Sequence, residues 1–349
     1  MTATAGELVR VHRRVVLRRW LIVAALCAAA LIAFIYSTVV GPVDLYFTQV
    51  VTGIVNPSSL SPKEHTVLWD LRLPMSAMAM LVGAALAASG AQMQTILGNP
   101  LAEPFTLGIS AAAAFGGAAA IVLGLSVVSI PQFNLAAAAW VFAMLATAVI
   151  VLAAVFRGAS AETMILLGIG MVFLFQALLA LMQYKASTEA LQQIVFWSMG
   201  SMTRATWVGN GVIAAVLLVV LPIFVIYSWQ LTALRLGDAR ALAMGVNVTR
   251  LRVAILLAVS LLAATTVAFS GIIGFVGLVG PHIARMLVGE DQRYFLPASM
   301  AAGALMLSAS HALSLSIRPG LAIPIGIITA LVGVPFFLFI ILTRKRALW

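Results

Sequence analysis

The sequence predicts an all-α polytopic membrane protein with about ten transmembrane helices in one domain. Of its 349 residues, 63% are hydrophobic and only 9% are charged. A soluble domain carries about 25% charged residues, so this composition excludes a soluble enzyme or a nucleic-acid-binding domain. Charge-free runs long enough to cross a bilayer recur along the whole chain. The basic residues gather in alternate connections between these runs, which is the pattern of a multi-pass membrane protein.

The spans follow from the charge-free runs in chain order. Pro131 and Asn134 stand near the middle of a run that is long enough for two helices. A later run has a glycine-rich second half, which favours a short, irregular span. The predicted spans are residues 20–43, 73–102, two within 104–156, 163–184, 205–234, one ending near Ser270, a short one reaching about Val288, 294–317 and 319–343.

The distribution of Lys and Arg predicts that both termini are cytoplasmic. With ten spans in this orientation, 15 of the 20 basic residues lie inside and five outside, the outer ones being Lys63, Arg72, Lys185, Arg204 and Arg318. The net charge of +10 is therefore an orientation signal and does not indicate a surface for a polyanion. Residues 1–19 form a basic cytoplasmic N-terminus, 20–343 the transmembrane permease domain and 344–349 a cytoplasmic C-terminus. The first span is too long for the apolar core of a signal peptide, so it is interpreted as an uncleaved helix.

The inner connection at residues 231–252 carries the clearest local pattern. Gly237 is a helix stop, Asp238 is a favourable N-cap for a helix through residue 244, and Gly245 is a second stop. Two short helices meeting at a corner are predicted. Small residues such as Ala241 would let the second helix dock closely into a groove of a cytoplasmic partner. An ordinary amphipathic connector is the alternative.

The chain offers little chemistry of its own. A phosphate-binding Gly-rich loop ending in Lys is absent, so the chain is not an ATPase, and the energy source is expected in another subunit. Glu103 and Glu162 lie at predicted cytoplasmic ends, which disfavours an ion-driven secondary transporter. The single cysteine, Cys27, allows neither an intrachain disulfide nor a cysteine metal cluster. His282 and His311 are each read as a gate or pathway residue or, alternatively, as a polar residue bonded within the bundle. Without an accompanying carboxylate they are a poor set for a membrane-embedded enzyme.

Several motifs, in order from Leu68 to Arg346, resemble the permease subunits of type II ABC importers (the FecCD type), which move iron-siderophores, haem and cobalamin. Any one of them alone would be weak, but together on ten independently counted spans they are specific. They are Leu71–Pro74 (LRLP), Gly83–Gln94 (GAALAASGAQMQ), Asn99–Pro104 (NPLAEP), Trp197–Ser201 (WSMGS), Leu236–Asp238 (LGD), Gly274–Arg285 (GFVGLVGPHIAR), Pro324–Ala330 (PIGIITA) and Pro335–Phe337 (PFF).

The resemblance implies the partners of the chain. Two permease subunits, as a homodimer or a heterodimer, would surround a pathway in the bacterial inner membrane. Two cytoplasmic ATPase subunits would use ATP and Mg, and a periplasmic or lipid-anchored binding protein would deliver the substrate. The permease itself would bind no cofactor, no metal and no nucleic acid.

The resemblance also implies roles for particular residues. The loop between residues 157 and 162 and the start of the fifth span would form part of an inner gate. An outer arginine would meet acidic residues of the binding protein. The implied residues are Gly237, Asp238, Ala241 and Gly245 for ATPase coupling; Arg72, with Arg318 as a second charge, for docking; Ser160, Met164, Gly168 and Met171 for pathway and gate; and Asn99, Pro100, Pro281, His282 and Arg285 as family motif.

Five positions depart from the family pattern. A second arginine is common where Met75 stands, an aspartate and an arginine where His311 and Leu315 stand, a glutamate at Ala322, and a branched residue at Gly280. The departures leave room for weaker docking on this subunit or for a partner subunit that carries the missing charges. The expected function is uptake of an iron chelate, with a siderophore favoured over haem and then cobalamin. The alternative is an ion-driven secondary transporter.

Overall fold

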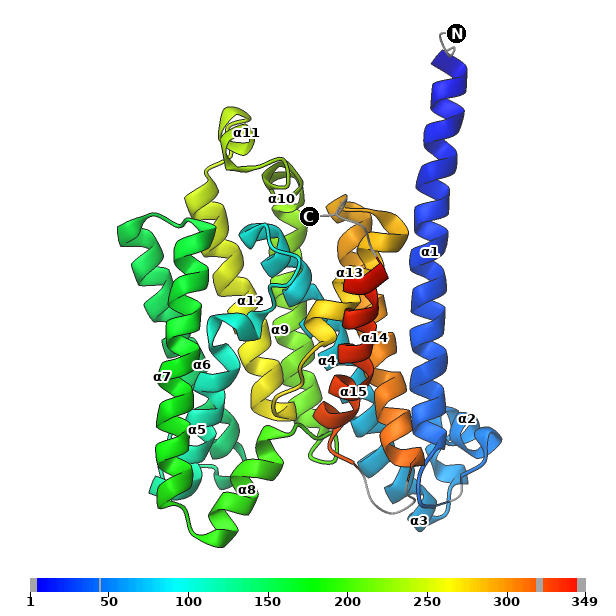
Figure 1. The fold of residues 1–349 in the computed structure, drawn as a ribbon. Helices are drawn as coiled ribbons and strands as arrows, with labels where there is room; N and C mark the ends of the chain where they lie inside the picture. The colour runs from blue at the N-terminus through cyan, green and yellow to red at the C-terminus, as the bar shows by residue number, and fades with distance from the viewer. Residues whose placement is uncertain (1–4, 44, 318–322, 344–349) are drawn as a thin grey trace.

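The structure is a computed structural model that describes residues 5–43, 45–317 and 323–343. All regular elements in these ranges are helices, arranged as one bundle (Figure 1). Their bounds are α1 (Ala5–Val39), α2 (Phe47–Val55), η1 (Pro57–Ser59), α3 (Pro62–His65), η2 (Thr66–Arg72), α4 (Leu73–Leu97), η3 (Pro104–Leu107), α5 (Ile109–Leu123), α6 (Pro131–Arg157), α7 (Ala161–Lys185), α8 (Thr188–Ser198), α9 (Trp207–Ile226), α10 (Ser228–Leu234), α11 (Asp238–Ala243), α12 (Val248–Ser270), α13 (Val276–Val288), α14 (Gln292–Ser316) and α15 (Ile325–Thr343).

Ten apolar helices are present among the described residues, which confirms the predicted fold class. Seven are long enough to cross a membrane, and three are shorter: α5, α13 and α15. The start of the short helix α15 and the loop after α8 are held by neighbouring backbone. Gly200 and Met199 accept hydrogen bonds from the first two residues of α15, and Ser270 accepts one from Ser201. Irregular backbone is tolerated at membrane depth when its polar groups are paired inside the protein in this way.

Helix α4 is the centre of the bundle, buried along most of its length. It packs against α14, α13 and α12 through small residues. A Cβ atom on Gly90 would lie 1.7 Å from the Gly277 carbonyl oxygen, and one on Gly83 would lie 2.4 Å from that of Gly303. These glycines therefore bring backbone against backbone.

Turn chemistry explains the pair of helices that the sequence predicts within residues 104–156. Pro131 is the first residue of α6, where a missing N–H costs no hydrogen bond. The Asn134 carboxamide accepts from the backbone of Val127 and donates to Leu125, which closes the preceding loop. These are the two residues from which the sequence predicts the break.

Two helix ends and one whole helix differ from the prediction. Helix α9 ends at Ile226, where the chain bends into α10, so the expected span 205–234 is two helices. Helix α4 ends at Leu97, because Gly98 takes a left-handed conformation. Helix α8 was not predicted; its first turn is capped by the Ser187 hydroxyl. The predicted domain limits themselves remain a prediction.

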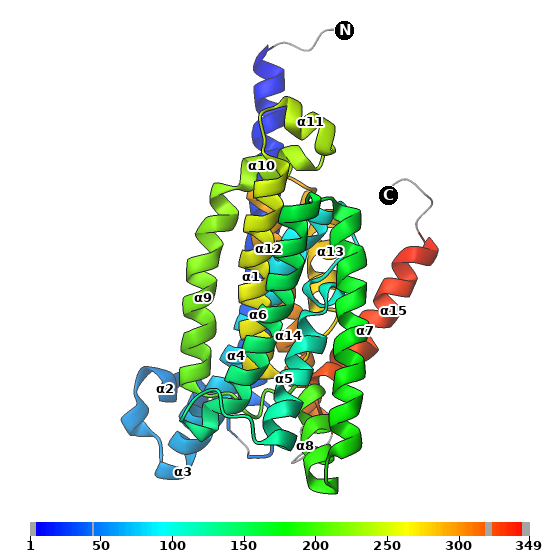
Figure 2. The ribbon, with the colours of Figure 1, turned by 90° about the vertical axis from the view of Figure 1, so that its left-hand side faces the viewer.

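The elements divide between two ends of the bundle. The start of α1, α11 and the end of α15 lie toward one end, and α2, α3 and α8 lie at the other (Figures 1 and 2). The described start of α1 and end of α15 therefore lie toward the same end, and the cytoplasmic location of the termini stays a prediction.

Candidate coupling site and gate

Arg252 joins the short helix α11 to the rest of the bundle. Its guanidinium donates to both Asp238 carboxylate oxygens at 2.8 Å, to the Ile96 carbonyl at 2.8 Å and to the Ala159 carbonyl at 2.9 Å. The Arg252 side chain is only 6% exposed, whereas that of Asp238 is 51% exposed. One buried charge thus ties α12 to α11, to the end of α4 and to the loop between α6 and α7.

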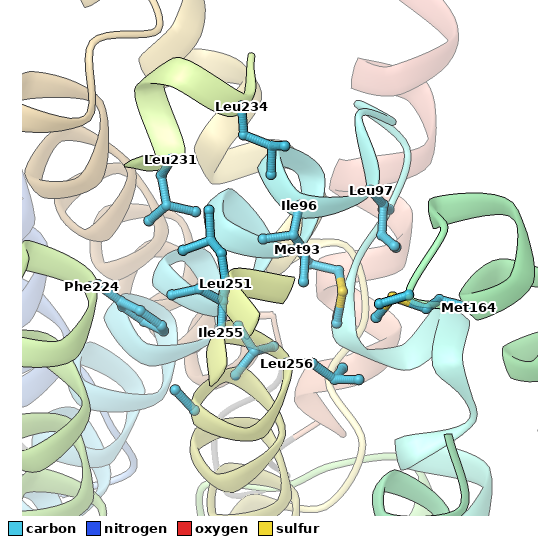
Figure 3. Close-up of a cluster of buried hydrophobic side chains, with 14 of the residues drawn as sticks. Met93, Ile96, Leu97, Met164, Phe224, Leu231, Leu234, Leu251, Ile255 and Leu256 are labelled. Carbon is cyan, nitrogen blue, oxygen red and sulfur yellow. The ribbon is translucent and has the colours of Figure 1, made fainter. Parts of the chain in front are cut away.

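Two polar cavities flank this arginine. A cavity of about 540 Å³ is lined by Asp238, Arg252, Ser160 and the end of α4, and one of about 390 Å³ lies between α11 and the Gly158–Ser160 loop. Both cavities lie between α11 and the loop that contains Ser160. Figure 3 shows the apolar cluster under this site, where Leu234, Leu251 and Ile96 come from α10, α12 and α4.

A second ionic cluster lies at the connection between α13 and α14. Glu290 forms ion pairs with Arg235 and, at 3.1 Å, with Arg285. Arg285 also donates to the Gln94 side chain of α4 at 2.7 Å. Burial lowers the pKa of Arg235 from its ordinary value, although the guanidinium stays charged at neutral pH. The predicted motif residue Arg285 therefore fixes α13 to the end of α4.

The structure corrects two details of the predicted coupling helix. Gly237, with φ of +98°, is the N-cap, and Asp238 is the first helical residue, whose carboxylate binds Arg252 instead of capping the helix. Ala241 is fully buried and packs inward, so it anchors the helix. The apolar residues left for a partner are Leu236, Leu242 and Met244, which are 54%, 59% and 42% exposed. Gly245, with φ of +84°, ends the helix as predicted.

The predicted gate residues on α7 lie on its packed face. Ser160 caps the helix by accepting from the Thr163 backbone N–H. Met164 is fully buried, and a Cβ on Gly168 would meet the Leu107 Cα at 2.9 Å. Met171 in turn packs against Gly108. In this conformation Met164, Gly168 and Met171 hold α7 to the segment before α5, whereas Ser160 is exposed and lines both polar cavities.

The opposite face of α7 carries a stripe of exposed residues that the sequence did not predict. Leu166, Gly170, Phe173, Gln176 and Tyr184 are all exposed there. The spacing puts them along one stripe of the helix. An exposed glutamine within a spanning helix is unfavourable against lipid, so this stripe is expected to face a water-filled path or another subunit. Gln176 was the available signal in the sequence.

Two predicted motif segments come together inside the bundle. The Glu103 carboxylate accepts a hydrogen bond from the backbone of Phe275, the N-cap of α13, which has a φ of +69°. Because α13 rises about 18 Å over its 13 residues, Glu103 is well away from the end of the bundle where it was expected. The expectation that no carboxylate lies deep was wrong: Glu103 serves as a cap for this short helix.

The other motif residues have local roles in the described chain. Asn99 accepts from the Leu101 backbone in the turn that contains Pro100. Pro281 is buried inside α13, and His282 beside it is partly buried. His311 is 3% exposed within α14, so it faces the bundle interior rather than an open path.

Arg72, the predicted docking charge, is buried. Its side chain is 6% exposed and donates to the backbone carbonyls of Thr38, Val39 and Val43, which hold the chain after α1. In this structure Arg72 holds the end of α1, and its role in docking the binding protein stays a prediction. The second predicted docking charge, Arg318, lies outside the described residues.

Comparisons with known proteins agree over most of the chain. The model of the FecCD transport family matches residues 29–343. The chain is 38% identical over 290 residues to the vitamin B12 import system permease protein of Vibrio vulnificus, covering 83% of this chain and 87% of the relative. It is 36% identical over 302 residues to the molybdate import system permease protein of Haemophilus influenzae, covering 85% and 87%.

A solved structure gives the same result for the fold. It is described as an inward-facing conformation of an ABC transporter assigned to the metal-chelate type, and it matches with a TM-score of 0.82 at 33% identity. The match covers 93% of this chain and 99% of the solved one. The chain therefore belongs to the FecCD transport family, and it is a membrane-spanning permease of an ABC importer.

Proposed function

We propose that this permease takes up an iron chelate across the bacterial cytoplasmic membrane and is driven through α11 by a separate ATPase. The observation that supports the coupling role is the set of hydrogen bonds from Arg252 to Asp238, Ile96 and Ala159. Any displacement of α11 acts on Asp238, and Arg252 transmits it to Ala159 at the start of α7 and to Ile96 at the end of α4. The exposed Leu236, Leu242 and Met244 offer the apolar contact for the ATPase.

The remaining parts of the transporter follow from the same assignment. ATP and Mg would be used by two cytoplasmic ATPase subunits. A second permease subunit, identical or different, would cover part of the exposed stripe of α7, and the rest of that stripe would line the path. A periplasmic or lipid-anchored binding protein would dock at the end that carries α2, α3 and α8. The excess of Lys and Arg at the α11 end supports a cytoplasmic location for that end.

The substrate is the most specific element of the proposed function. The likeness to a metal-chelate type transporter supports a chelate, with a siderophore favoured over haem and then cobalamin. The relatives named for vitamin B12 and molybdate widen the range of cargo that this fold carries. Measuring which ligand the cognate binding protein retains on purification tests this choice. Retention of molybdate without any chelate would overturn it.

The coupling role is tested by replacing Arg252 with Lys in the reconstituted transporter. Lysine keeps the charge, but its compact ammonium cannot span the carboxylate and the two carbonyls that the guanidinium joins. We expect uptake to fall about tenfold, a coupling loss of about 1.4 kcal/mol, while ATP hydrolysis continues. Uptake and hydrolysis are measured in the same proteoliposomes.

The matched control is Arg250→Lys, since Arg250 is exposed on the same helix two residues earlier. Equal uptake by the two variants would contradict the role of Arg252. A further measurement addresses the energy source. Uptake that a protonophore abolishes in ATP-loaded vesicles would favour the ion-driven alternative, in which Glu103 would be the carboxylate to examine.

A further inference from the structure

The structure contains a large apolar groove that is lined by none of the coupling or gate residues described above. It has a volume of about 900 Å³ and is bounded by α1, α4, α14 and the end of α9. Its walls include Phe34, Leu81, Leu221, Val225, Leu296 and Met300. Helix α1 closes one side, packing mainly on α14. The groove therefore lies at the edge of the bundle that is away from α7.

We propose that this groove binds an anionic phospholipid of the leaflet on the α11 side, which the proposed topology makes the cytoplasmic one. The length of the groove, the position of its polar residues and the charges at its mouth all fit such a lipid. Only the name of the leaflet depends on the proposed function.

The groove has the length of an acyl chain. Its lining on α1 runs from Trp20 to Phe34, which is about 21 Å along a helix at 1.5 Å per residue. One leaflet contributes about 15 Å of the hydrocarbon thickness. A hydrocarbon tail that enters at the Trp20 end therefore finds apolar side chains over the full depth of its leaflet.

The polar lining residues all lie at one end. Ser228, Gln292 and Arg293 stand where α9 ends and α14 begins, and the other lining residues are apolar apart from Cys27 and the indole of Trp20. Trp20 meets the Tyr294 ring edge-on at 5.4 Å, which places two amphipathic rings at the same level. Such rings mark the headgroup region of a bilayer. This gradient fits an amphiphile with a polar head and does not fit a uniformly apolar or a water-soluble ligand.

The charges at this end favour an anionic head. The Arg19 and Arg293 guanidinium groups lie over the Tyr294 ring, 5.2 and 5.8 Å from its centroid. Both also approach Asp291, at 4.0 and 2.7 Å. Hydrogen bonds from Arg293 hold the pKa of Asp291 below its ordinary value, so the carboxylate is ionised. Two positive groups face one negative group, and the Arg293 side chain is 70% exposed, which leaves donors for a phosphate.

The site adjoins the coupling elements. Ser228 is the first residue of α10, which leads into α11. The Gln292 carboxamide is bonded to Gln92 at 3.0 Å and to Thr95 at 3.1 Å, both near the end of α4. A lipid seated in the groove therefore braces α1 and α14 against the segment that carries the ATPase contact.

The test is a lipid titration of the purified full chain by native mass spectrometry, with phosphatidylglycerol and phosphatidylcholine as probes. The wild-type chain should bind phosphatidylglycerol more tightly. The double variant R19Q/R293Q should lose about tenfold in affinity for phosphatidylglycerol and change little for phosphatidylcholine. Asp291→Asn should strengthen phosphatidylglycerol binding, because it removes the carboxylate that competes for the two arginines. Arg250→Gln removes an exposed charge that does not line the groove and is the control.

A second variant locates the site. Ala84 lines the groove and is partly exposed to it, so Ala84→Phe should obstruct the groove and weaken retention of both lipids without lowering the melting temperature. Equal affinity for the two lipids in the wild-type chain would overturn the anionic preference. Full lipid retention by Ala84→Phe would overturn the groove as the site. Neither result depends on the ATPase, so failure here is distinct from failure of the coupling role of Arg252.

Discussion

At the scale of single residues, buried arginines hold this permease together where the chain is irregular. Arg252 joins the first residue of α11, the end of α4 and the α6–α7 loop, and Arg72 binds three carbonyls at and just after the end of α1. A guanidinium suits this role because it is always charged and its donors are arranged in a rigid fork. Its burial is tolerated because it donates to several acceptors at once.

Replacing Arg72 with Gln should destabilise the chain. Its side chain is only 6% exposed, so the loss leaves the carbonyls of Thr38, Val39 and Val43 without their buried donor. We expect a cost of about 2 kcal/mol, visible as a lower melting temperature of the detergent-solubilised protein. Lys63→Gln, at an exposed outer position, is the control and should melt like wild type. A normal melt combined with salt-sensitive loss of binding-protein affinity would instead support the docking role of Arg72.

The sequence predicted only part of what these residues do. It located Gly237, Asp238 and Gly245 correctly as the limits of a short helix, because turn chemistry is local. It did not single out Arg252, whose carbonyl acceptors are 93 and 156 residues away along the chain. Side-chain partners at such separations depend on packing, which residue spacing does not reveal.

At the scale of helices, contacts between glycines set how closely α4 approaches its neighbours. Gly90→Ala should lower the melting temperature, because the added Cβ would lie 1.7 Å from the Gly277 carbonyl oxygen and the two backbones would have to separate. Gly211→Ala on α9 is the matched control, since nothing lies within 4 Å of the corresponding position. Melting curves from size-exclusion samples measure both. Equal shifts for the two variants would contradict the close packing.

A second prediction at this scale is that the exposed stripe of α7 is accessible to water. In a Cys27→Ala background, Gln176→Cys should react with a water-soluble maleimide in the reconstituted transporter. Leu218→Cys on α9 is 70% exposed but expected to face lipid, so it should react slowly. A thiol in hydrocarbon remains protonated and unreactive. Equal labelling rates would show that the α7 stripe does not border water.

The existence of the ten helices was predictable, whereas some of their ends were not. Charge-free runs revealed the helices because a charge within the bilayer is costly. The bend after Ile226 was not visible, since α10 is as free of charge as α9. Helix α8 was overlooked for the opposite reason: it is short and polar, lies between spans and is evident only from its Ser187 cap.

At the scale of the molecule, the uneven distribution of basic residues predicts the orientation. In the Cys27→Ala background, Lys63→Cys should be labelled by a membrane-impermeant maleimide applied to intact spheroplasts. Arg240→Cys on α11 should be labelled only after permeabilisation. Both positions are exposed at opposite ends of the bundle. The reverse pattern would place α11 outside and would be incompatible with a cytoplasmic ATPase on it.

Helix α1 has a consequence for how partners assemble. The first turns of α1 project past α11 (Figure 1), and residues 5–18 of this helix amount to about 21 Å. This segment carries Arg10, Arg13, Arg14 and Arg18 and lies beside the surface on which an ATPase would bind. A partner bound to α11 has to fit next to this basic segment, which limits the directions from which it can approach. Deleting the residues before Arg19 would remove that steric limit while leaving the membrane-spanning part of the helix intact.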